Sequence, residues 1–132
     1  TEHRYLECFS HATDEIMRQA GVDDAYIAAG GSFFTVETHI CHIDEVMACA
    51  PIYVDTQILS VAGKKMWLFH RLFDKSGTIL ATGEHMLLHV NMTQRRSSQP
   101  TALVAAKLAK MAAGHAMLEM PDAAGRAVGM TR

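Results

Sequence analysis

The chain places its most reactive side chains in two short segments with different periodicity. Glu2 and His3 precede an apolar pattern with helical spacing, and Glu37 stands in a run rich in Phe, Thr, Val and Ile. Strand alternation along this run places Glu37 on one face with Thr35 and His39. The first N–H groups of a helix lack intrahelical partners and can stabilise negative charge on a carbonyl oxygen. A carboxylate or histidine close by can activate water. These groups could together support hydrolysis at a carbonyl carbon, although Glu2 also suits a simple interaction with the helix dipole.

The eight histidines raise the question of a metal site. His39 and His42 are three residues apart, which on a strand sends them to opposite faces. His85 and His89 share a face but lie about 13 Å apart at the usual rise per residue. We therefore predict no metal site, and we expect no cofactor.

Composition narrows the class of protein. The 132 residues are 49% hydrophobic and 20% charged with a net charge of -2, which is typical of one globular domain and gives no support for nucleic-acid binding. No run approaches the roughly 20 apolar residues of a membrane helix, and no signal-peptide pattern opens the chain. Cys8, Cys41 and Cys49 lack a catalytic signature. We expect reduced thiols in a cytoplasmic protein that binds neither membrane nor nucleic acid.

The periodicity predicts an α+β domain over residues 1–116. Tyr5, Phe9, Ile16 and Ala20 follow one helical face, and Gly21 is a natural helix end. Alternating and β-branched runs predict four antiparallel strands, with a hairpin turn at 74–77. The predicted elements are helix 1–20, a turn or short helix at 21–31, strands 32–43, 52–61, 65–73 and 78–91, helix 101–116 and a flexible tail 117–132.

Several short sequence segments within about residues 1–100 are similar to those of a known family. RYL (4–6), VDTQIL (54–59), DKSGTILATGE (74–84) and HMLLHV (85–90) resemble the 4-hydroxybenzoyl-CoA thioesterase type of hotdog-fold protein. FTVETHI (34–40), DEV (44–46) and LFHRL (68–72) resemble more narrowly the thioesterases of bacterial carnitine breakdown. Those occur alone or fused to L-carnitine dehydrogenase and are associated with betainyl-CoA. The resemblance implies a long central helix wrapped by a curved antiparallel sheet, and hydrolysis of a short-chain acyl-CoA thioester.

Two departures from the family pattern affect the expected site. The family's first strand and an Asp-x-x-Gly-His segment should precede the helix, and Tyr5 leaves no room for them. We expect that strand and acid upstream of Thr1, the alternative being that the acid is missing. Met66-Trp67 also replaces the smaller or histidine-containing pair expected in the carnitine branch.

The resemblance implies four catalytic candidates. It places the N-terminus of the first helix, with Glu2 and His3, beside the reacting carbon. It places the strand of Glu37 at a dimer interface near the active site, where this carboxylate either activates water or forms half of an inter-subunit polar pair. Glu45 lies in a segment that belongs to the resemblance and is the fourth candidate.

The predicted substrate-binding residues serve three parts of an acyl-CoA. Tyr5, Thr38 and His39 lie beside the catalytic candidates. Trp67 and Phe69 share one side of a strand and could face a trimethylammonium group, although such aromatic residues are more often core. The phosphates of CoA would be held by the cationic residues Lys64, Lys65, Arg95 and Arg96.

The resemblance also implies a homodimer or a dimer of dimers, because the family builds its site from two subunits. Two other functions of the same fold stay open at this point. One is a non-catalytic acyl-CoA-binding module, and the other is a hotdog dehydratase.

Overall fold

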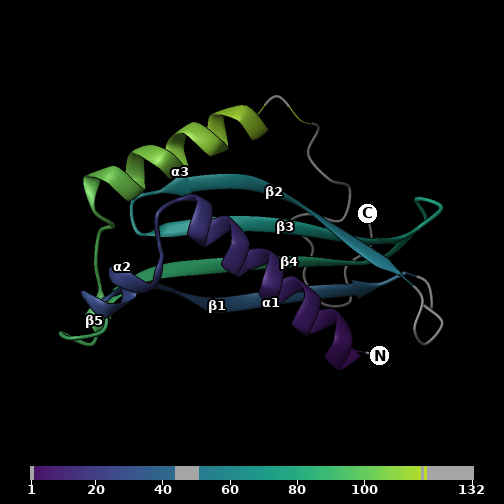
Figure 1. Ribbon diagram of the computed structural model, residues 1–132, viewed down its shortest axis with the longest axis horizontal. Coiled ribbons are helices and arrows are strands. Elements are labelled where there is room, and N and C mark those ends of the chain that lie inside the picture. The colour runs from purple at the N-terminus through teal and green to yellow at the C-terminus, as the bar shows by residue number, and fades with distance from the viewer. Residues whose placement is uncertain (1, 44–50, 117, 119–132) are drawn as a thin grey trace.

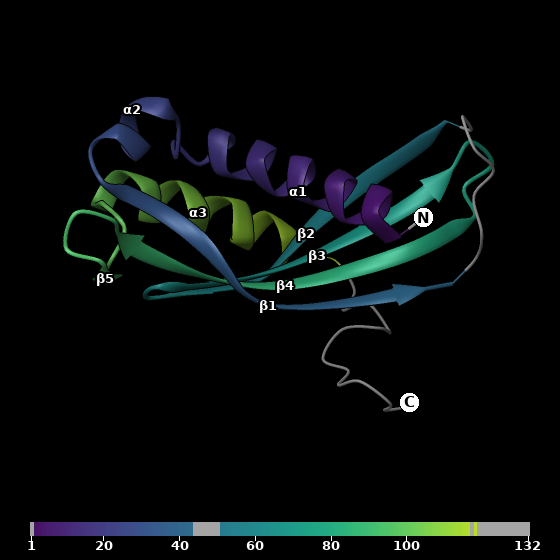
Figure 2. The ribbon, with the colours of Figure 1, turned by 90° about the horizontal axis from the view of Figure 1, so that it is seen from below.

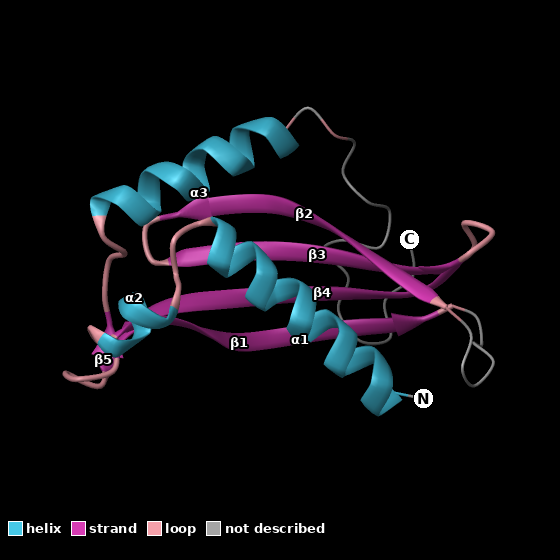
Figure 3. Cartoon of the chain, in the orientation of Figure 1, coloured by secondary structure: helices cyan, strands magenta, loops and turns pink. Residues whose placement is uncertain are grey.

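The structure, a computed structural model, describes residues 2–43, 51–116 and 118, with side chains from Tyr5 onward. Helices and strands follow each other almost as the periodicity predicts (Figure 3). The elements in chain order are α1 (Glu2–Gln19), α2 (Asp24–Ala28), β1 (Gly31–His42), β2 (Ile52–Ala62), β3 (Lys65–Asp74), β4 (Ile79–Asn91), β5 (Arg96–Ser97) and α3 (Ala102–His115). Residues 119–132, most of the predicted tail, lie outside the described part of the chain.

The four long strands form one antiparallel sheet in the order β1-β4-β3-β2, with the short β5 paired to β4. The helices α1 and α3 lie on the same face of this curved sheet (Figures 1 and 2). A long helix cradled by a curved antiparallel sheet is the hotdog arrangement, so the predicted fold class is confirmed. The additional strand expected upstream of Thr1 stays a prediction.

A β-bulge changes which side chains of β1 face α1. The register shifts between Thr35 and Glu37, so Val36 is the extra residue of the bulge. Thr35 therefore faces α1 together with Thr38, whereas strict alternation had placed Thr35 on the side of Glu37. Glu37, paired with Met86, lies on the opposite face of the sheet, which we call the outer face. The grouping of Thr35 with Glu37 was wrong because alternation cannot register a one-residue bulge.

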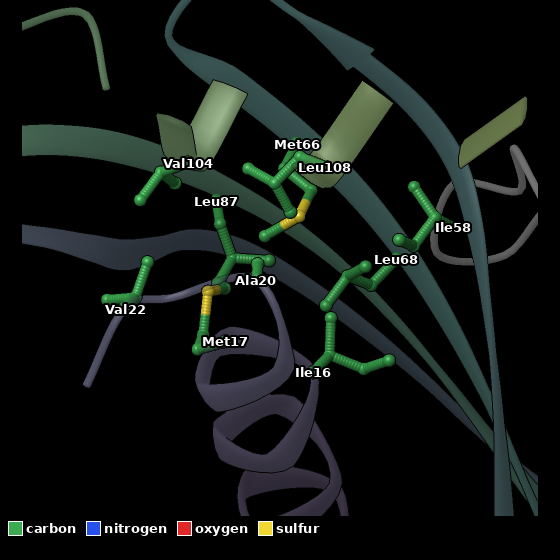
Figure 4. Packing of buried hydrophobic residues seen from close by; sticks show 10 residues of the cluster. All are labelled: Ile16, Met17, Ala20, Val22, Ile58, Met66, Leu68, Leu87, Val104 and Leu108. Carbon is green, nitrogen blue, oxygen red and sulfur yellow. The ribbon is translucent and has the colours of Figure 1, made fainter. Parts of the chain in front are cut away.

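Two apolar clusters form the core beneath the helices. The larger joins the C-terminal half of α1 to α3 and the sheet, and Ile16, Leu68 and Leu108 are among its members (Figure 4). The smaller lies under the N-terminal half of α1 and comprises Tyr5, Phe9, Leu72, Leu80 and Ala81. Burying such side chains is the main favourable contribution to folding.

Phe9 can approach the sheet only because residue 83 is a glycine. A Cβ atom at Gly83 would lie 2.8 Å from Cδ2 of Phe9, a distance that carbon atoms do not tolerate. Phe9 is fully buried, and its ring stacks on His70 with 5.7 Å between centroids. This contact fixes the height of α1 above β4 and β3, next to the polar residues described below.

Candidate active site

A groove of about 610 Å³ runs between α1 and β1. It stays open because α1 packs on β2 and β3, while β1 is an edge strand of the sheet. Thr35 and Thr38 are therefore exposed although they face the helix side. The wall formed by α1 contains Leu6, Ser10, Thr13, Asp14, Met17 and Arg18. The facing wall contains Ser32, Phe33, Thr35 and Thr38 of β1 with His85 and Leu87 of β4.

A band of two histidines and three threonines separates the two apolar clusters. His70 is fully buried, and its two ring nitrogens are both paired: Nε2 lies 2.8 Å from Oγ1 of Thr13, and Nδ1 lies 2.7 Å from Oγ1 of Thr56. His85 lies beside it, with 5.2 Å between the ring centroids, and its Nδ1 is 2.9 Å from Oγ1 of Thr38. We call these five residues the polar band.

Both histidines of the polar band are held neutral. Burial, with a smaller contribution from the nearby imidazole of His85, lowers the pKa of His70 to about 3. Burial also lowers the pKa of His85. Neutral imidazoles accept and donate one hydrogen bond each, so hydroxyl groups are suitable partners for them.

One nitrogen of this band has no partner. Nε2 of His85 is buried and makes no hydrogen bond within the part of the chain that the structure describes. The ring is only 6% exposed, yet it forms part of the groove wall. Buried side-chain nitrogens are nearly always paired, so this atom marks a place where something else is expected to bind.

The remaining charges of the groove are mainly negative. Asp14, Asp23 and Asp24 line it, and Asp23 also caps α2 by accepting a hydrogen bond from N of Tyr26. The single cationic residue of its lining, Arg18, forms an ion pair with Glu15. The groove therefore favours positive over negative ligand groups.

Of the predicted residues of the helix side, the structure shows one in the lining of this groove. Thr38 lines it, whereas Tyr5 is buried and stacks on His42 with 5.3 Å between ring centroids. Glu2 and His3 lie in the first turn of α1, as predicted, but their side chains are not described. Glu45 lies outside the described residues.

Four other predicted residues meet on the outer face, away from the groove. The register aligns Glu37 with Met86 and Trp67 in one row, and His39 with Glu84 and Phe69 in the next. Nε1 of Trp67 donates a 2.6 Å hydrogen bond to Glu84, and Phe69 is only 2% exposed. Nε2 of His39 lies 3.8 Å from Sγ of Cys41. The sequence placed Glu37 on one face with His39, and Trp67 on one side with Phe69. The structure brings the two pairs together on the face that α1 does not cover.

The four predicted phosphate-binding residues lie at the end of the sheet that carries β5. Lys64 donates a 3.2 Å hydrogen bond to Oγ of Ser97, and Arg96 pairs with Asn91 in the β4–β5 ladder. Arg95 precedes β5 with a positive φ of 56°, and Lys65 begins β3. These cations stand outside the lining of the groove.

Sequence reasoning missed Thr13, Asp14, His70 and His85 as site residues. In the sequence, Asp14 lies outside the apolar face of the first helix. The spacing of His85 and His89 did place them on one face, and the register confirms this, since they pair with Thr38 and Phe33. No local sequence pattern indicates that His85 lies next to His70, because their proximity depends on the pairing of β3 with β4.

Two further findings concern residues 2–43, 51–116 and 118, which the structure describes. No group of three or more His, Cys, Asp or Glu side chains there could hold a metal ion. None of the helices in these ranges has the length and apolar character needed to cross a membrane.

Comparison with known sequences identifies the family. Residues 1–126 match the Thioesterase-like superfamily. The chain belongs to this superfamily. A betainyl-CoA thioesterase of Pseudomonas aeruginosa is 38% identical over 128 residues, covering 96% of this chain and 80% of that protein. The L-carnitine dehydrogenase/betainyl-CoA thioesterase of Ruegeria pomeroyi is 48% identical over 97% of this chain, which spans 26% of that longer protein. These matches confirm the resemblance that the short sequence segments indicated.

Solved structures share the fold of this thioesterase-like chain. A hypothetical protein of Staphylococcus aureus, solved in complex with CoA, superposes with a TM-score of 0.90 over 99% of this chain and 84% of that one, at 20% identity. A DHNA-CoA thioesterase of the same species gives a TM-score of 0.80 at 12% identity, over 92% of this chain and 84% of that one. At these identities the likeness concerns the fold alone.

Proposed function

We propose that this thioesterase-like chain hydrolyses acyl-CoA thioesters and that betainyl-CoA is its preferred substrate. The observation that carries the proposal is the 38% identity to a betainyl-CoA thioesterase across 80% of that protein's length. The open groove between α1 and β1 is the place where we expect the acyl group to bind. The cytoplasm, where acyl-CoA thioesters are used, is the compartment that this proposal implies.

The charge of the groove supports a cationic acyl group. A trimethylammonium group cannot donate classical hydrogen bonds, so it is recognised by negative charge and by aromatic faces. Asp14, Asp23, Asp24 and Phe33 offer both along the groove. Trp67 and Phe69, which the sequence suggested for this task, lie on the outer face instead and would require a second binding location.

The chemistry needs a donor and a base. N–H groups at the start of α1 would stabilise the oxyanion while water attacks the carbonyl carbon and gives its proton to a carboxylate or histidine. Collapse of the intermediate then breaks the C–S bond, and CoA leaves as the thiol. Glu2, His3, Glu45, Glu37 or an acid upstream of Thr1 remain the candidates for the base.

We also propose that two copies of the chain pair through β1. In the described part of the chain no strand covers the free edge of β1, and Phe34 and Val36 there are 49% and 59% exposed. An uncovered edge with apolar side chains favours pairing with another strand. A homodimer, alone or as half of a dimer of dimers, would bring Glu37 and His39 of one subunit near the other, and would leave Lys64, Lys65, Arg95 and Arg96 accessible for CoA phosphates.

Release of free thiol from a panel of acyl-CoAs tests the proposal. We expect faster release from betainyl-CoA than from its uncharged isostere 3,3-dimethylbutanoyl-CoA, in which carbon replaces the quaternary nitrogen. The variant Asp14→Asn should raise KM for betainyl-CoA more than KM for the uncharged substrate, because it removes one negative charge from the groove. Glu7→Gln, which removes an exposed carboxylate outside the lining, is the matched control.

Other outcomes would favour the alternatives. Tight binding of acyl-CoA without thiol release would indicate a non-catalytic binding module. A change in the absorbance of an enoyl-CoA without loss of CoA would indicate a dehydratase. A monomer in light scattering that retains full turnover would contradict pairing through β1.

A further inference from the structure

The two histidines of the polar band differ in one respect. His70 is fully buried and uses both ring nitrogens, with Thr13 on one side and Thr56 on the other. His85 is buried almost as deeply, but Thr38 satisfies only its Nδ1, and Nε2 has no partner among the described residues. The two rings lie 5.2 Å apart, so they share one environment and differ mainly in this hydrogen bond.

Leaving a nitrogen unpaired there has a cost. A buried polar atom without a partner destabilises a fold by about 1–3 kcal/mol, and an apolar ring of similar size at position 85 would avoid that loss. Phe9 already packs edge-on against His85, with 6.1 Å between ring centroids, so the surroundings suit an aromatic side chain. Packing alone therefore does not account for a histidine at this place.

The position of the ring indicates what the partner is. His85 is the residue of the polar band that reaches the groove from β4, where it stands between Thr38 of β1 and Thr13 of α1 in the lining. A ligand that fills the groove therefore lies against the wall to which His85 belongs, and Nε2 is buried in that wall. Burial keeps this imidazole neutral, so it offers one N–H and one lone pair and adds no charge to an already acidic groove.

We propose that Nε2 of His85 donates a hydrogen bond to the thioester carbonyl oxygen of the acyl-CoA bound in the α1–β1 groove, instead of the N–H groups at the start of α1, which lie about three helical turns from Thr13. In this arrangement the hydroxyl of Thr38 donates to Nδ1, which leaves the ring proton on Nε2 and aims it at the substrate. Thr38 is then a positioning residue for His85. The inference deepens the proposed function and rests on it, since it assumes an acyl-CoA ligand.

The low exposure of the ring makes this hydrogen bond effective. A donor shielded from water interacts more strongly with a carbonyl oxygen than an exposed donor does. A site built to pair with an oxygen also discriminates against ligands that lack one, because the donor is then left unpaired. His85 would thus favour acyl-CoA over alkyl thioethers of CoA.

Two substitutions at position 85 test the assignment. His85→Phe keeps an aromatic ring but removes both nitrogens, and we expect kcat/KM for betainyl-CoA to fall about 10- to 100-fold. The melting temperature should not fall, because the variant also removes the unpaired nitrogen. His85→Gln retains a side-chain N–H donor and should recover part of the loss.

A spectroscopic readout makes the test independent of turnover. The imidazole 15N shifts of His85 should report the tautomer with the proton on Nε2. They should move on titration with a ketone analogue of betainyl-CoA, in which a methylene group separates sulfur from the carbonyl. The thioether of CoA that lacks the carbonyl should bind more weakly and leave Nε2 almost unchanged.

The outcomes separate the inference from the proposed function. If the ketone analogue saturates the protein while the Nε2 resonance stays in place, or if His85→Phe keeps the wild-type kcat/KM, Nε2 is satisfied by water only and the inference is wrong. The proposed thioesterase function would survive that result. If the wild-type protein neither releases thiol nor binds the analogue, both the inference and the proposed function are wrong. Should His85→Phe not fold, the Gln variant and the 15N titration still decide.

Discussion

The core has two parts that are built on different principles. Beneath α3 and the C-terminal half of α1, the core is a cluster of apolar side chains such as Leu68, Val104 and Leu108. Beneath the N-terminal half of α1, the polar band of His70, His85 and three threonines lies next to Phe9 and Leu72. The same sheet and the same helix contribute to both parts.

The difference indicates that the two parts of the core have different roles. Apolar burial is non-directional and tolerates exchange of similar side chains, so it suits the part that stabilises the fold. Buried hydrogen bonds require each partner to be in place, so they fix the orientation of a few side chains. The polar band borders the groove, whereas the cluster under α3 meets it through Met17, Val22 and Leu87. Four predictions test this comparison, in order of decreasing effect.

The largest effect is expected in the apolar part. Leu108→Ala should lower the free energy of unfolding by about 2–5 kcal/mol, because Leu108 is fully buried and its truncation leaves a cavity. Urea denaturation measures this change. Leu103→Ala on the same helix is the control, since Leu103 is 66% exposed and should change stability by less than about 0.5 kcal/mol. Equal losses in both variants would show that α3 does not anchor the core.

The second prediction concerns the pH dependence of stability. The pKa of His70 is about 3 in the folded protein and close to 6.5 in the unfolded chain. Below pH 6.5 the unfolded chain therefore binds a proton that the folded protein does not bind, and the free energy of unfolding decreases as the pH falls towards 3. At pH 5.0 this contribution amounts to about 2 kcal/mol relative to pH 7.5.

Removing the titrating group should remove that part of the pH dependence. His70→Gln retains hydrogen-bonding capacity towards Thr13 and Thr56 but has no proton to bind in this range. The difference in unfolding free energy between pH 7.5 and 5.0 should then be about 2 kcal/mol smaller than in the wild type. His85 and His89, whose pKa values burial also lowers, account for further loss in both proteins. An unchanged difference would mean that His70 is not buried as a neutral ring.

The third prediction contrasts two threonines of the polar band. Thr56→Val leaves Nδ1 of the buried His70 unpaired and should cost about 1–2 kcal/mol of stability while kcat/KM stays the same. Thr38→Val should do the reverse. Thr38 is exposed, so stability should change little, but kcat/KM should fall about 3- to 10-fold because His85 loses the partner that sets its tautomer. The same pattern in both variants would remove the distinction between a structural and a functional histidine.

The smallest effect is expected on the outer face. Glu37 was one of the candidates for activating water, a role in which Glu37→Gln would lower turnover strongly while leaving the fold intact. The bulge at Val36 turns Glu37 away from the groove, so we now expect this variant to lower turnover less than Thr38→Val does. Thiol release and light scattering should be measured on the same sample. A severe loss of turnover in an intact dimer would mean that a partner subunit brings Glu37 to the reacting carbon.

The predictions made from sequence were accurate for the elements and less so for the site. Apolar spacing located α1, and the DKSG turn located the β3–β4 hairpin, because both signals are local. The short β5 was missed, since a two-residue strand such as Arg96–Ser97 has no period to detect. Thr38 was predicted to bind substrate and lies in the groove lining, and only the structure shows that its hydroxyl pairs with His85.

The sequence by itself determined the class of fold and the family, because each depends on local periodicity or on short sequence segments. The tertiary structure decided which face of the sheet holds the groove and which residues meet there. Thr13, Thr38, His70 and His85 come from α1, β1, β3 and β4, and long-range packing together with one bulge sets their positions. Such contacts arise from the register and curvature of the whole sheet, and no stretch of a few residues carries them.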